Sequence, residues 1–544
     1  MVKEVKQPFH RVLKPDSFPK RFNTHKYWGK KPSNVVDEYI EYYTKPGDTV
    51  LDPFSGSGVV FTESALLNRK AIAYDINPIA KMLSTSLLSG VDPETFLEAY
   101  TKLLENVSNF LDPLYKTHDE EGELRKVVAW LWNDDELVGV RYLNNRGKAV
   151  DKLPDEEDLL LEKQSHDLNI EHWIPEDLIF DGWQTKKLKR RGFVKYSDLF
   201  THRNLWALSI IFSEITKIKD ENVKQLMTVA FTGSVAQGSK LMTNYGKSAG
   251  PSWKINTFWI APNRMELNVL HYFSNRFKKV LSGLEEVTSK GKLKYEPKFF
   301  EKSSSNMSDL ESNSVDYIFT DPPYGGEGIQ YMELSYLWNV WLKYFGESIR
   351  WRDEIAYNEY REEKKDADSY EQGLGQVFAE SFRVLKPGAW ISITFANKDI
   401  KTWTSLMRVL NQNGFVLKNI IPMKPSAPSI TQLNMKDASK SDLILNLQKP
   451  SGNSGTQEQM DLSLFDFSES VARAVKSIKA DNGIITIGHV FDFVTIDWMT
   501  DMFSNIDLSV SVPMFTKDEI RTVLEEQLNL TETEETFAGD AVWE

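Results

Sequence analysis

The chain has 544 residues, of which 41% are hydrophobic and 12% aromatic, enough for two or three domains with sizeable cores. It contains no cysteine, which excludes disulfides, thiolate zinc sites and any cysteine nucleophile. The formal net charge of −13 excludes a basic surface over the whole chain, so any contact with nucleic acid must be local.

The first 90 residues have the pattern of a nucleoside-binding α/β unit. We predict a helix, a strand, a helix and a second strand over residues 33–43, 49–51, 59–68 and 71–75. Gly56 and Gly58, in the turn after the first strand, let the backbone approach a ligand closely. Asp75 ends the second strand, where a carboxylate can accept hydrogen bonds from ribose hydroxyls. Phe61 stands where a dinucleotide fingerprint needs a third glycine, which favours S-adenosylmethionine over a pyrophosphate ligand.

Residues 91–294 are predicted to form a mainly helical unit. Helical periodicity covers residues 92–111, with Asp92 as N-cap and Pro93 as first helical residue, and also residues 205–228. Residues 127–151 alternate in polarity around a turn at 144–147, which indicates a small β-hairpin. The histidines of this unit have no ligand spacing, and we expect no metal site.

Two stretches of this unit are candidates for contact with nucleic acid. The first is a basic run interleaved with aromatic residues, and its candidates are Lys186, Lys187, Lys189, Arg190 and Arg191. The second is a Gly-, Ser- and Asn-rich segment over residues 233–253, predicted to be a mobile loop, with Gln237, Lys240, Asn244 and Lys247 as the residues to test. A solvated charged face and a plain surface loop are the alternatives.

A second motif follows the apolar run at residues 315–319. It consists of Asp321, Pro322, Pro323 and Tyr324. An exocyclic amino group of a base is a poor nucleophile, and a carboxylate together with a proline-fixed backbone carbonyl can hold its hydrogens and free its lone pair. The aromatic ring can stack on a base that has left the duplex. The alternative is a Pro-Pro turn that closes a buried strand, with Asp321 as a cap and Tyr324 packed.

With these two motifs the chain resembles the DNA amino methyltransferases, which modify N6 of adenine or N4 of cytosine. Phe54, Gly56 and Gly58 match the family's Phe-x-Gly-x-Gly, and residues 321–324 match its Asp-Pro-Pro-Tyr. Lys31 and Pro32 look like the family's Lys-Pro element, which contributes to the methionine end of the cofactor. The resemblance implies catalytic roles for Asp321, Pro322, Pro323 and Tyr324. It implies S-adenosyl-L-methionine as cofactor, bound by Lys31, Pro32, Asp52, Pro53, Phe54, Ser55, Gly56, Gly58, Asp75, Ile76 and Asn77.

The resemblance also implies the architecture. We expect a doubly wound, seven-stranded, Rossmann-like α/β core, with later strands near residues 388–395, 414–421 and 443–447. The cofactor motif precedes the catalytic motif, which resembles the alpha order of the family, where the insert recognises the target. The predicted divisions are 1–90 and 295–449 for the two halves of the core, 91–294 for the insert and 457–544 for an accessory region.

The expected function is site-specific methylation of adenine N6 in double-stranded DNA, on a flipped-out base, within restriction–modification or phage defence. In the family an initial Asp favours adenine and an initial Ser cytosine, so methylation of cytosine N4 is the nearest alternative. An RNA guanine-N2 methyltransferase and a non-catalytic DNA-binding subunit are the others. Methylation of cytosine C5 is excluded, because that reaction needs a thiolate.

The C-terminal residues read as a separate part. Residues 449–456 have the composition of a linker, and 484–490 are a candidate strand. Residues 517–544 hold nine carboxylates against two basic residues, which suits a protein partner, such as a restriction or defence subunit, better than DNA. No apolar run could span a membrane and the first residues lack the apolar stretch of a secretion signal, so we expect a cytoplasmic protein.

Overall fold

The computed structural model describes residues 7–244, 253, 257–325, 330–358, 364–397, 400–423, 442–452, 466–480, 485–505, 515–527, 530–531 and 542–543. At its centre is a seven-stranded sheet in the order β11-β12-β10-β9-β1-β2-β8. The bounds are β1 Thr49–Asp52, β2 Lys70–Tyr74, β8 Lys298–Phe300, β9 Val315–Thr320, β10 Leu385–Phe395, β11 Val416–Met423 and β12 Asp442–Gln448. β12 runs antiparallel to β10 and β11, and the remaining neighbours are parallel. The α/β class predicted from the sequence is confirmed.

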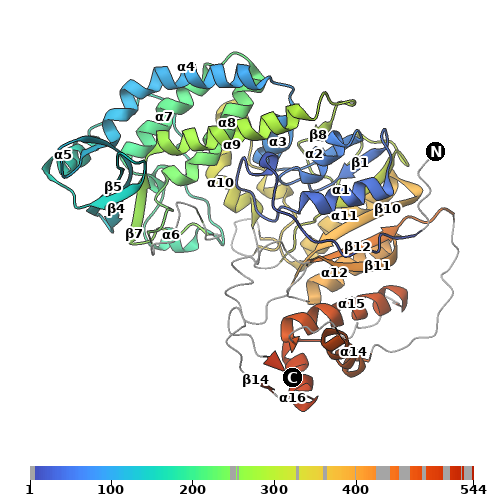
Figure 1. Ribbon diagram of the computed structural model, residues 1–544. Helices are drawn as coiled ribbons and strands as arrows, with labels where there is room; N and C mark the ends of the chain where they lie inside the picture. The colour runs from blue at the N-terminus through green and yellow to red at the C-terminus, as the bar shows by residue number, and fades with distance from the viewer. Residues whose placement is uncertain are drawn as a thin grey trace.

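Helices cover both faces of this sheet. Alternate residues of a strand point to opposite faces, and here the residues on both faces are apolar and need to be covered. Val50 and Phe319 pack with α1 (Ser33–Tyr43) and the start of α2 (Val59–Leu66). Leu51 and Ile318, their neighbours along the strands, pack with α11 (Ala367–Val384) and α12 (Ile400–Gln412). The strands are therefore apolar on both sides, as buried parallel strands are. Figure 1 shows this core at the right of the molecule.

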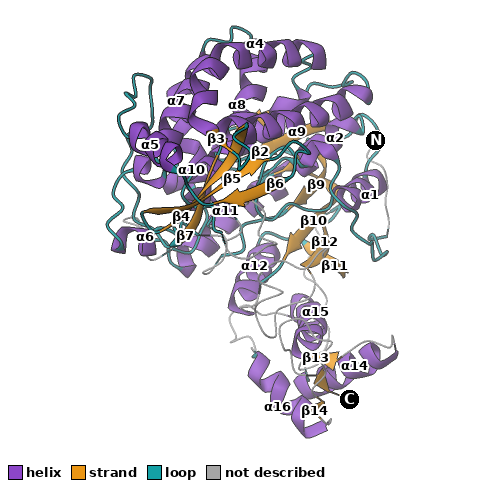
Figure 2. Cartoon of the chain, turned by 60° about the vertical axis from the view of Figure 1, so that its left-hand side comes forward, coloured by secondary structure: helices purple, strands orange, loops and turns teal. Residues whose placement is uncertain are grey.

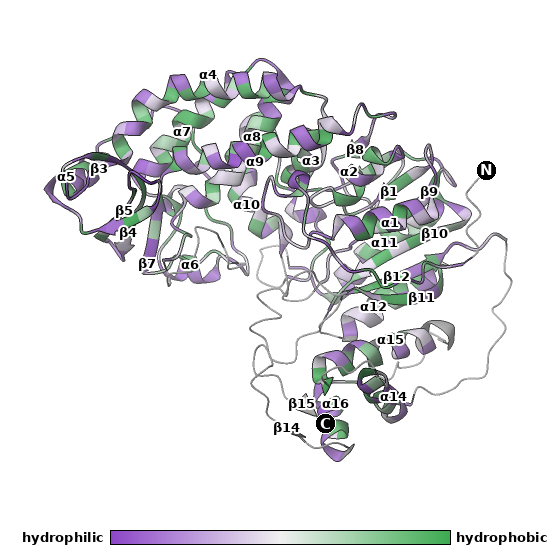
Figure 3. Cartoon of the chain, viewed as in Figure 1, coloured by the Kyte–Doolittle hydropathy of each residue, from purple (hydrophilic) through white to green (hydrophobic). Residues whose placement is uncertain are grey.

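The insert projects from the core as a second body (Figure 1), and Figure 2 shows that it contains both helices and strands. Its helices are α4 Pro93–Leu111, α5 Glu156–Ser165, α6 Lys186–Arg190, α7 His202–Thr216, α8 Glu221–Gly238 and α9 Val269–Ser289. Its five-stranded sheet consists of β3 Lys116–His118, β4 Leu124–Asn133, β5 Glu136–Leu143, β6 Ala149–Lys152 and β7 Asn263–Leu267. The predicted turn joins β5 to β6, and Asp92 caps α4 by accepting from two backbone amides. Apolar and polar residues alternate along the ribbons of α4 and α9, as the periodicity of amphipathic helices requires (Figure 3).

One helix of the core is shared with the insert. α10 (Tyr331–Leu342), which follows the catalytic motif, is buried from Met332 to Leu342. It belongs to a single hydrophobic cluster with α7, α8 and α9 of the insert and with α3 (Pro78–Thr85) of the core. A helix that is buried on all sides requires such surroundings.

Three predictions about local structure are wrong. Residues 205–228 form two helices rather than one, because Asp220 caps a new helix, α8, with its side chain. Residues 233–238, predicted to be a loop, lie in the buried part of α8. Residues 484–490, predicted to be a strand, contain only the two-residue β13 (Ile485–Thr486) before α15 begins.

The C-terminal region packs against the core. It contains α14 Phe467–Ala480, α15 Ile487–Asn505 and α16 Lys517–Gln527, with a small sheet of β13, β14 Leu530–Thr531 and β15 Val542–Trp543. Val471 and Trp498 belong to the same hydrophobic cluster as the strands β9 and β10. Among the described residues, no helix is long and apolar enough to cross a membrane.

Candidate active site

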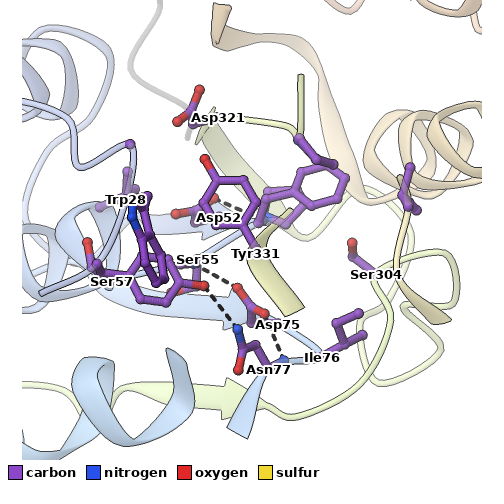
Figure 4. A pocket seen from close by; sticks show the side chains of 18 of the residues that line it. Trp28, Asp52, Ser55, Ser57, Asp75, Ile76, Asn77, Ser304, Asp321 and Tyr331 are labelled. Carbon is purple, nitrogen blue, oxygen red and sulfur yellow. Dashed lines mark hydrogen bonds between the residues drawn. The ribbon is translucent and has the colours of Figure 1, made fainter. Parts of the chain in front are cut away.

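The two motifs meet at one edge of the sheet. β1 and β9 are adjacent and parallel, so their carboxyl ends lie side by side although 268 residues separate Asp52 from Thr320. The Thr320 hydroxyl donates to Asp52 Oδ1 over 2.9 Å, and Asp321 is the next residue. One pocket is lined by both motifs, with Asp321 at one end and Asp75 and Asn77 at the other (Figure 4).

The turn after β1 is held in shape by its own hydrogen bonds. The Phe54 amide donates to Asp52 Oδ1 over 3.1 Å, and the Gly58 amide donates to the Ser55 carbonyl over 2.8 Å. Gly58 has a φ of +76°, which favours glycine, and a Cβ there would lie 2.7 Å from Ser84 Cα in α3. The turn can therefore pack closely against α3 only because residue 58 has no side chain.

Asp75 fixes the floor of the pocket. Its carboxylate accepts from the amide of Gly56 over 2.8 Å and from the amide of Asn77 over 2.9 Å. Burial raises the pKa of Asp75 to about 6, and the two amide donors oppose that rise. The Asn77 side chain is held in turn by Ser335 and Asn339 of α10. This carboxylate, with the apolar side chain of Ile76 beside it, suits a nucleoside whose ribose hydroxyls donate to Asp75 and whose base lies against Ile76.

Asp321 is surrounded by donors. The Tyr324 hydroxyl and the Thr394 hydroxyl donate to Oδ1 over 2.9 Å and 3.0 Å, and Lys31 Nζ lies 3.2 Å from Oδ2. Burial raises the pKa of Asp321 to about 6, although Lys31 opposes this. Burial also raises the pKa of Tyr324, which therefore remains a donor at neutral pH.

The backbone of the catalytic motif is held by two neighbouring elements. Tyr370 of α11 donates its hydroxyl to the Pro323 carbonyl over 2.6 Å. The Asn397 side chain, beyond β10, donates to the Tyr324 carbonyl over 2.6 Å. Within the part of the chain that the structure describes, the Pro322 carbonyl accepts no hydrogen bond and so keeps its acceptor capacity.

Most of the residues predicted for the site line the pocket. They are Lys31, Asp52, Pro53, Phe54, Ser55, Gly56, Asp75, Ile76, Asn77, Asp321 and Pro323. Pro32, Gly58, Pro322 and Tyr324 are not among the lining residues; Pro32 caps α1, and Gly58 packs against α3. Sequence reasoning missed Tyr27, Trp28, Gly29, Lys30, Ser57, Val59, Val60, Lys302, Ser303, Ser304, Phe319, Tyr331, Met332, Asp353, Glu354 and Ile355. The signals that could have indicated some of these are the aromatic run before Lys31 and the position of Ser57 between the two glycines of the turn.

The basic run predicted to contact DNA forms α6, whose Leu188 is buried. Lys187, Arg190 and Arg191 are exposed, and Lys186 and Lys189 are half-buried. Lys189 forms an ion pair with Asp181, and the Arg191 guanidinium donates to the Ile260 carbonyl.

α6 is linked to the catalytic half of the core. The backbone amide of Gln184, just before α6, donates to Oε2 of the buried Glu333 of α10 over 2.8 Å. In the second candidate segment, Lys240 is half-buried and donates to the Asp198 carbonyl over 3.1 Å, and Asn244 is half-buried. Lys247 lies outside the described residues.

Comparison with known proteins gives a consistent result. The chain matches the DNA methylase family of N6/N4 methyltransferases over residues 3–85 and 315–499, which leaves out the insert. It is similar to type II methyltransferase M.BamHI of Bacillus amyloliquefaciens, at 30% identity over 149 residues, or 27% of this chain and 33% of that protein. The chain thus spans about a third of the length of that relative.

Two further similarities are weaker. Type II methyltransferase M.MjaII of Methanocaldococcus jannaschii is 20% identical over 423 residues, or 69% of this chain and 71% of that protein. A solved SAM-dependent methyltransferase from Methanosarcina mazei is 13% identical and covers 31% of this chain and 77% of its own. The TM-score of that structure is 0.16, a likeness too low to bear on function.

Proposed function

Because the chain belongs to the DNA amino methyltransferase family, whose cofactor is S-adenosyl-L-methionine, we propose that it transfers a methyl group to an amino group of a DNA base. The observation that supports this most directly is the single pocket lined by Asp321 and by the turn at residues 52–56. The pocket fits the cofactor, since Asp75 offers a carboxylate to ribose hydroxyls and Ile76 and Phe54 offer apolar surface. We further propose that the sheet and its helices are the doubly wound, Rossmann-like core of such an enzyme.

We assign the chemistry of the target to the catalytic motif. Asp321 and the Pro322 carbonyl hold the two hydrogens of the amino group, so that its lone pair points towards the pocket. The cofactor supplies an electrophilic methyl group on a sulfonium. The nitrogen lone pair forms the N–C bond, the C–S bond leaves its electron pair on sulfur, and one amino proton passes to Asp321 and then to solvent. Burial of Asp321 suits this role, because a carboxylate with a raised pKa is a better proton acceptor near neutral pH.

The target we propose is N6 of an adenine that has been flipped out of double-stranded DNA, with Tyr324 stacked on the base. The Asp at position 321 favours adenine, by resemblance to the family, and methylation of cytosine N4 is the alternative. The exposed basic residues of α6 would contact phosphates of the same DNA, since the segment before α6 is held by Glu333 next to the catalytic half. Both relatives are named type II methyltransferases, so we propose a role in restriction–modification or a related defence system.

The test is methylation of unmodified genomic DNA and of bulk RNA by the purified protein, with the product nucleosides separated by mass spectrometry. N6-methyladenine in DNA is expected. N4-methylcytosine in DNA would assign the target to cytosine instead of adenine, and methylated guanine in RNA alone would refute the proposal. Asp321→Ala should abolish transfer and leave the affinity for S-adenosyl-L-methionine within a few-fold. Asp497→Asn, in an ion pair of α15 far along the chain, is the control and should keep full activity. An equal loss of transfer and cofactor affinity in Asp321→Ala would contradict the role of that carboxylate.

A further inference from the structure

Lys31 is bound to more than the catalytic carboxylate. Its ammonium group lies 3.2 Å from Asp321 Oδ2 and 3.0 Å from Asp442 Oδ2, and it also donates to the Tyr324 hydroxyl. The Lys31 side chain is 8% exposed, and that of Asp442, the first residue of β12, is 27% exposed. The ammonium donates hydrogen bonds to Asp442 and Tyr324 and forms an ion pair with Asp321, so the buried cation is shared between two carboxylates.

This arrangement limits how a substrate can reach Asp321. Oδ1 already accepts from Tyr324 and Thr394, which fills its two lone pairs. Oδ2 forms an ion pair with Lys31, so a target amino group must share this oxygen with a cation or displace it. A cation that stays on Oδ2 offsets the negative charge of the carboxylate and so weakens Oδ2 as an acceptor for the amino hydrogen.

We propose that Asp442 is a positioning residue that takes Lys31 from Asp321 when the amino group binds, so that Asp321 Oδ2 can accept the amino hydrogen. This inference rests on the proposed function and adds a residue that the catalytic motif does not contain. Lys31 thereby acts in the catalytic network, in addition to the place at the methionine end of the cofactor that the resemblance implies. A small movement is enough, because Lys31 already contacts both carboxylates.

The charges around Asp321 determine in which direction its pKa moves when Asp442 or Lys31 is replaced. Lys31 lowers the pKa of Asp321, and Asp442 raises it. The other titratable groups near it are Tyr324 of the catalytic motif, Tyr331 of α10 and Asp52 of β1. Removal of the charge of Asp442 should therefore lower the pKa of Asp321, and removal of the charge of Lys31 should raise it. Replacement of a residue with a purely structural role would leave the pKa of Asp321 unchanged.

The experiment measures kcat for methyl transfer from pH 5 to pH 8.5, and the dissociation constant for S-adenosyl-L-methionine by calorimetry. In Asp442→Asn we expect kcat at pH 8 to fall by about tenfold or more. The acidic limb of the kcat–pH profile of this variant should shift to lower pH. Its affinity for S-adenosyl-L-methionine should stay within about twofold of the wild type. Lys31→Gln should shift the acidic limb to higher pH. Asp442→Glu keeps the charge and should keep the wild-type limb, which covers the case in which the Asn variant does not fold.

Asp497→Asn is the matched control, since Asp497 is also 27% exposed and in an ion pair, 2.8 Å from Arg473. It should behave as the wild type. An acidic limb that does not move in Asp442→Asn, or a loss confined to cofactor affinity, would overturn the inference. A wild-type protein that methylates no nucleic acid would instead refute the proposed function, so the two failures are distinguishable.

Discussion

Replacement of Gly58 by alanine should damage the turn after β1, which we call the cofactor turn. The same replacement at Gly90, a glycine with nearly the same φ, should not. Gly58 and Gly90 have φ angles of +76° and +75°, so alanine at either position carries the same backbone strain of about 1–2 kcal/mol. A Cβ at Gly90 meets nothing within 4 Å, whereas one at Gly58 lies 2.7 Å from Ser84 Cα, a backbone atom that cannot rotate away. Overpacking of this kind costs about 1–3 kcal/mol more.

The two variants therefore separate strain from overlap. Gly90→Ala should lower the free energy of unfolding by about 1–2 kcal/mol, and Gly58→Ala by about 2–5 kcal/mol. Thermal unfolding measures this, at roughly 2 °C per kcal/mol for a large chain. Ser84 Oγ lies 3.2 Å from Ser55 Oγ, so a displaced Ser84 also disturbs the turn, and Gly58→Ala should weaken cofactor binding while Gly90→Ala does not. Equal melting temperatures for the two variants would refute the steric argument.

The remaining predictions concern the carboxylates of the pocket and the basic helix. Asp75→Ala leaves two amides without their acceptor, and the dissociation constant for S-adenosyl-L-methionine should rise about tenfold or more by calorimetry; unchanged affinity would contradict its role. Burial raises the pKa of Asp52 to about 7, so the folded protein binds this proton more tightly than the unfolded chain does, and the ionised carboxylate destabilises the fold above about pH 7. Asp52→Asn should then raise the melting temperature relative to wild type more at pH 8.5 than at pH 5, and a larger gain at pH 5 would show the sign to be wrong. The double change Lys187→Gln and Arg190→Gln should weaken DNA binding at all sequences and reduce the slope of log K against log salt by about 2; an unchanged slope would exclude phosphate contacts by α6.

The cofactor turn and the catalytic motif could be predicted because each is local. A short apolar strand followed by glycines, or by Asp-Pro-Pro-Tyr, contains its own structural reason within a dozen residues. Ser304 and Glu354 reach the pocket through the packing of distant elements, and nothing in their own neighbourhood of the sequence indicates it. Lys31 was found by resemblance, but its pairing with Asp442 depends on the order of strands β10 and β12, which spacing along the chain does not reveal.

The errors in local structure have a common cause, which is that burial outweighs composition. Residues 233–238 have the Gly and Ser content of a loop, yet small residues are what allow α8 to approach α9: a Cβ at Gly233 would lie 2.8 Å from the Arg276 side chain. A short apolar run such as 484–490 suits a strand and a buried helix equally well. Periodicity alone could not reveal the break at Asp220, because apolar residues continue at helical spacing on both sides of it.

The burial of α10 limits how the proposed contact of the insert with DNA could be changed by engineering. Trp341, 0% exposed, lies against Phe212 and Phe231 of the insert, although α10 itself follows the catalytic motif along the chain. A chimera that receives a foreign unit in place of the insert would leave this indole in water unless the graft brought a complementary surface. A change of the proposed DNA contact should therefore succeed by redesign of the exposed side of the insert, and exchange of the whole insert should yield insoluble protein.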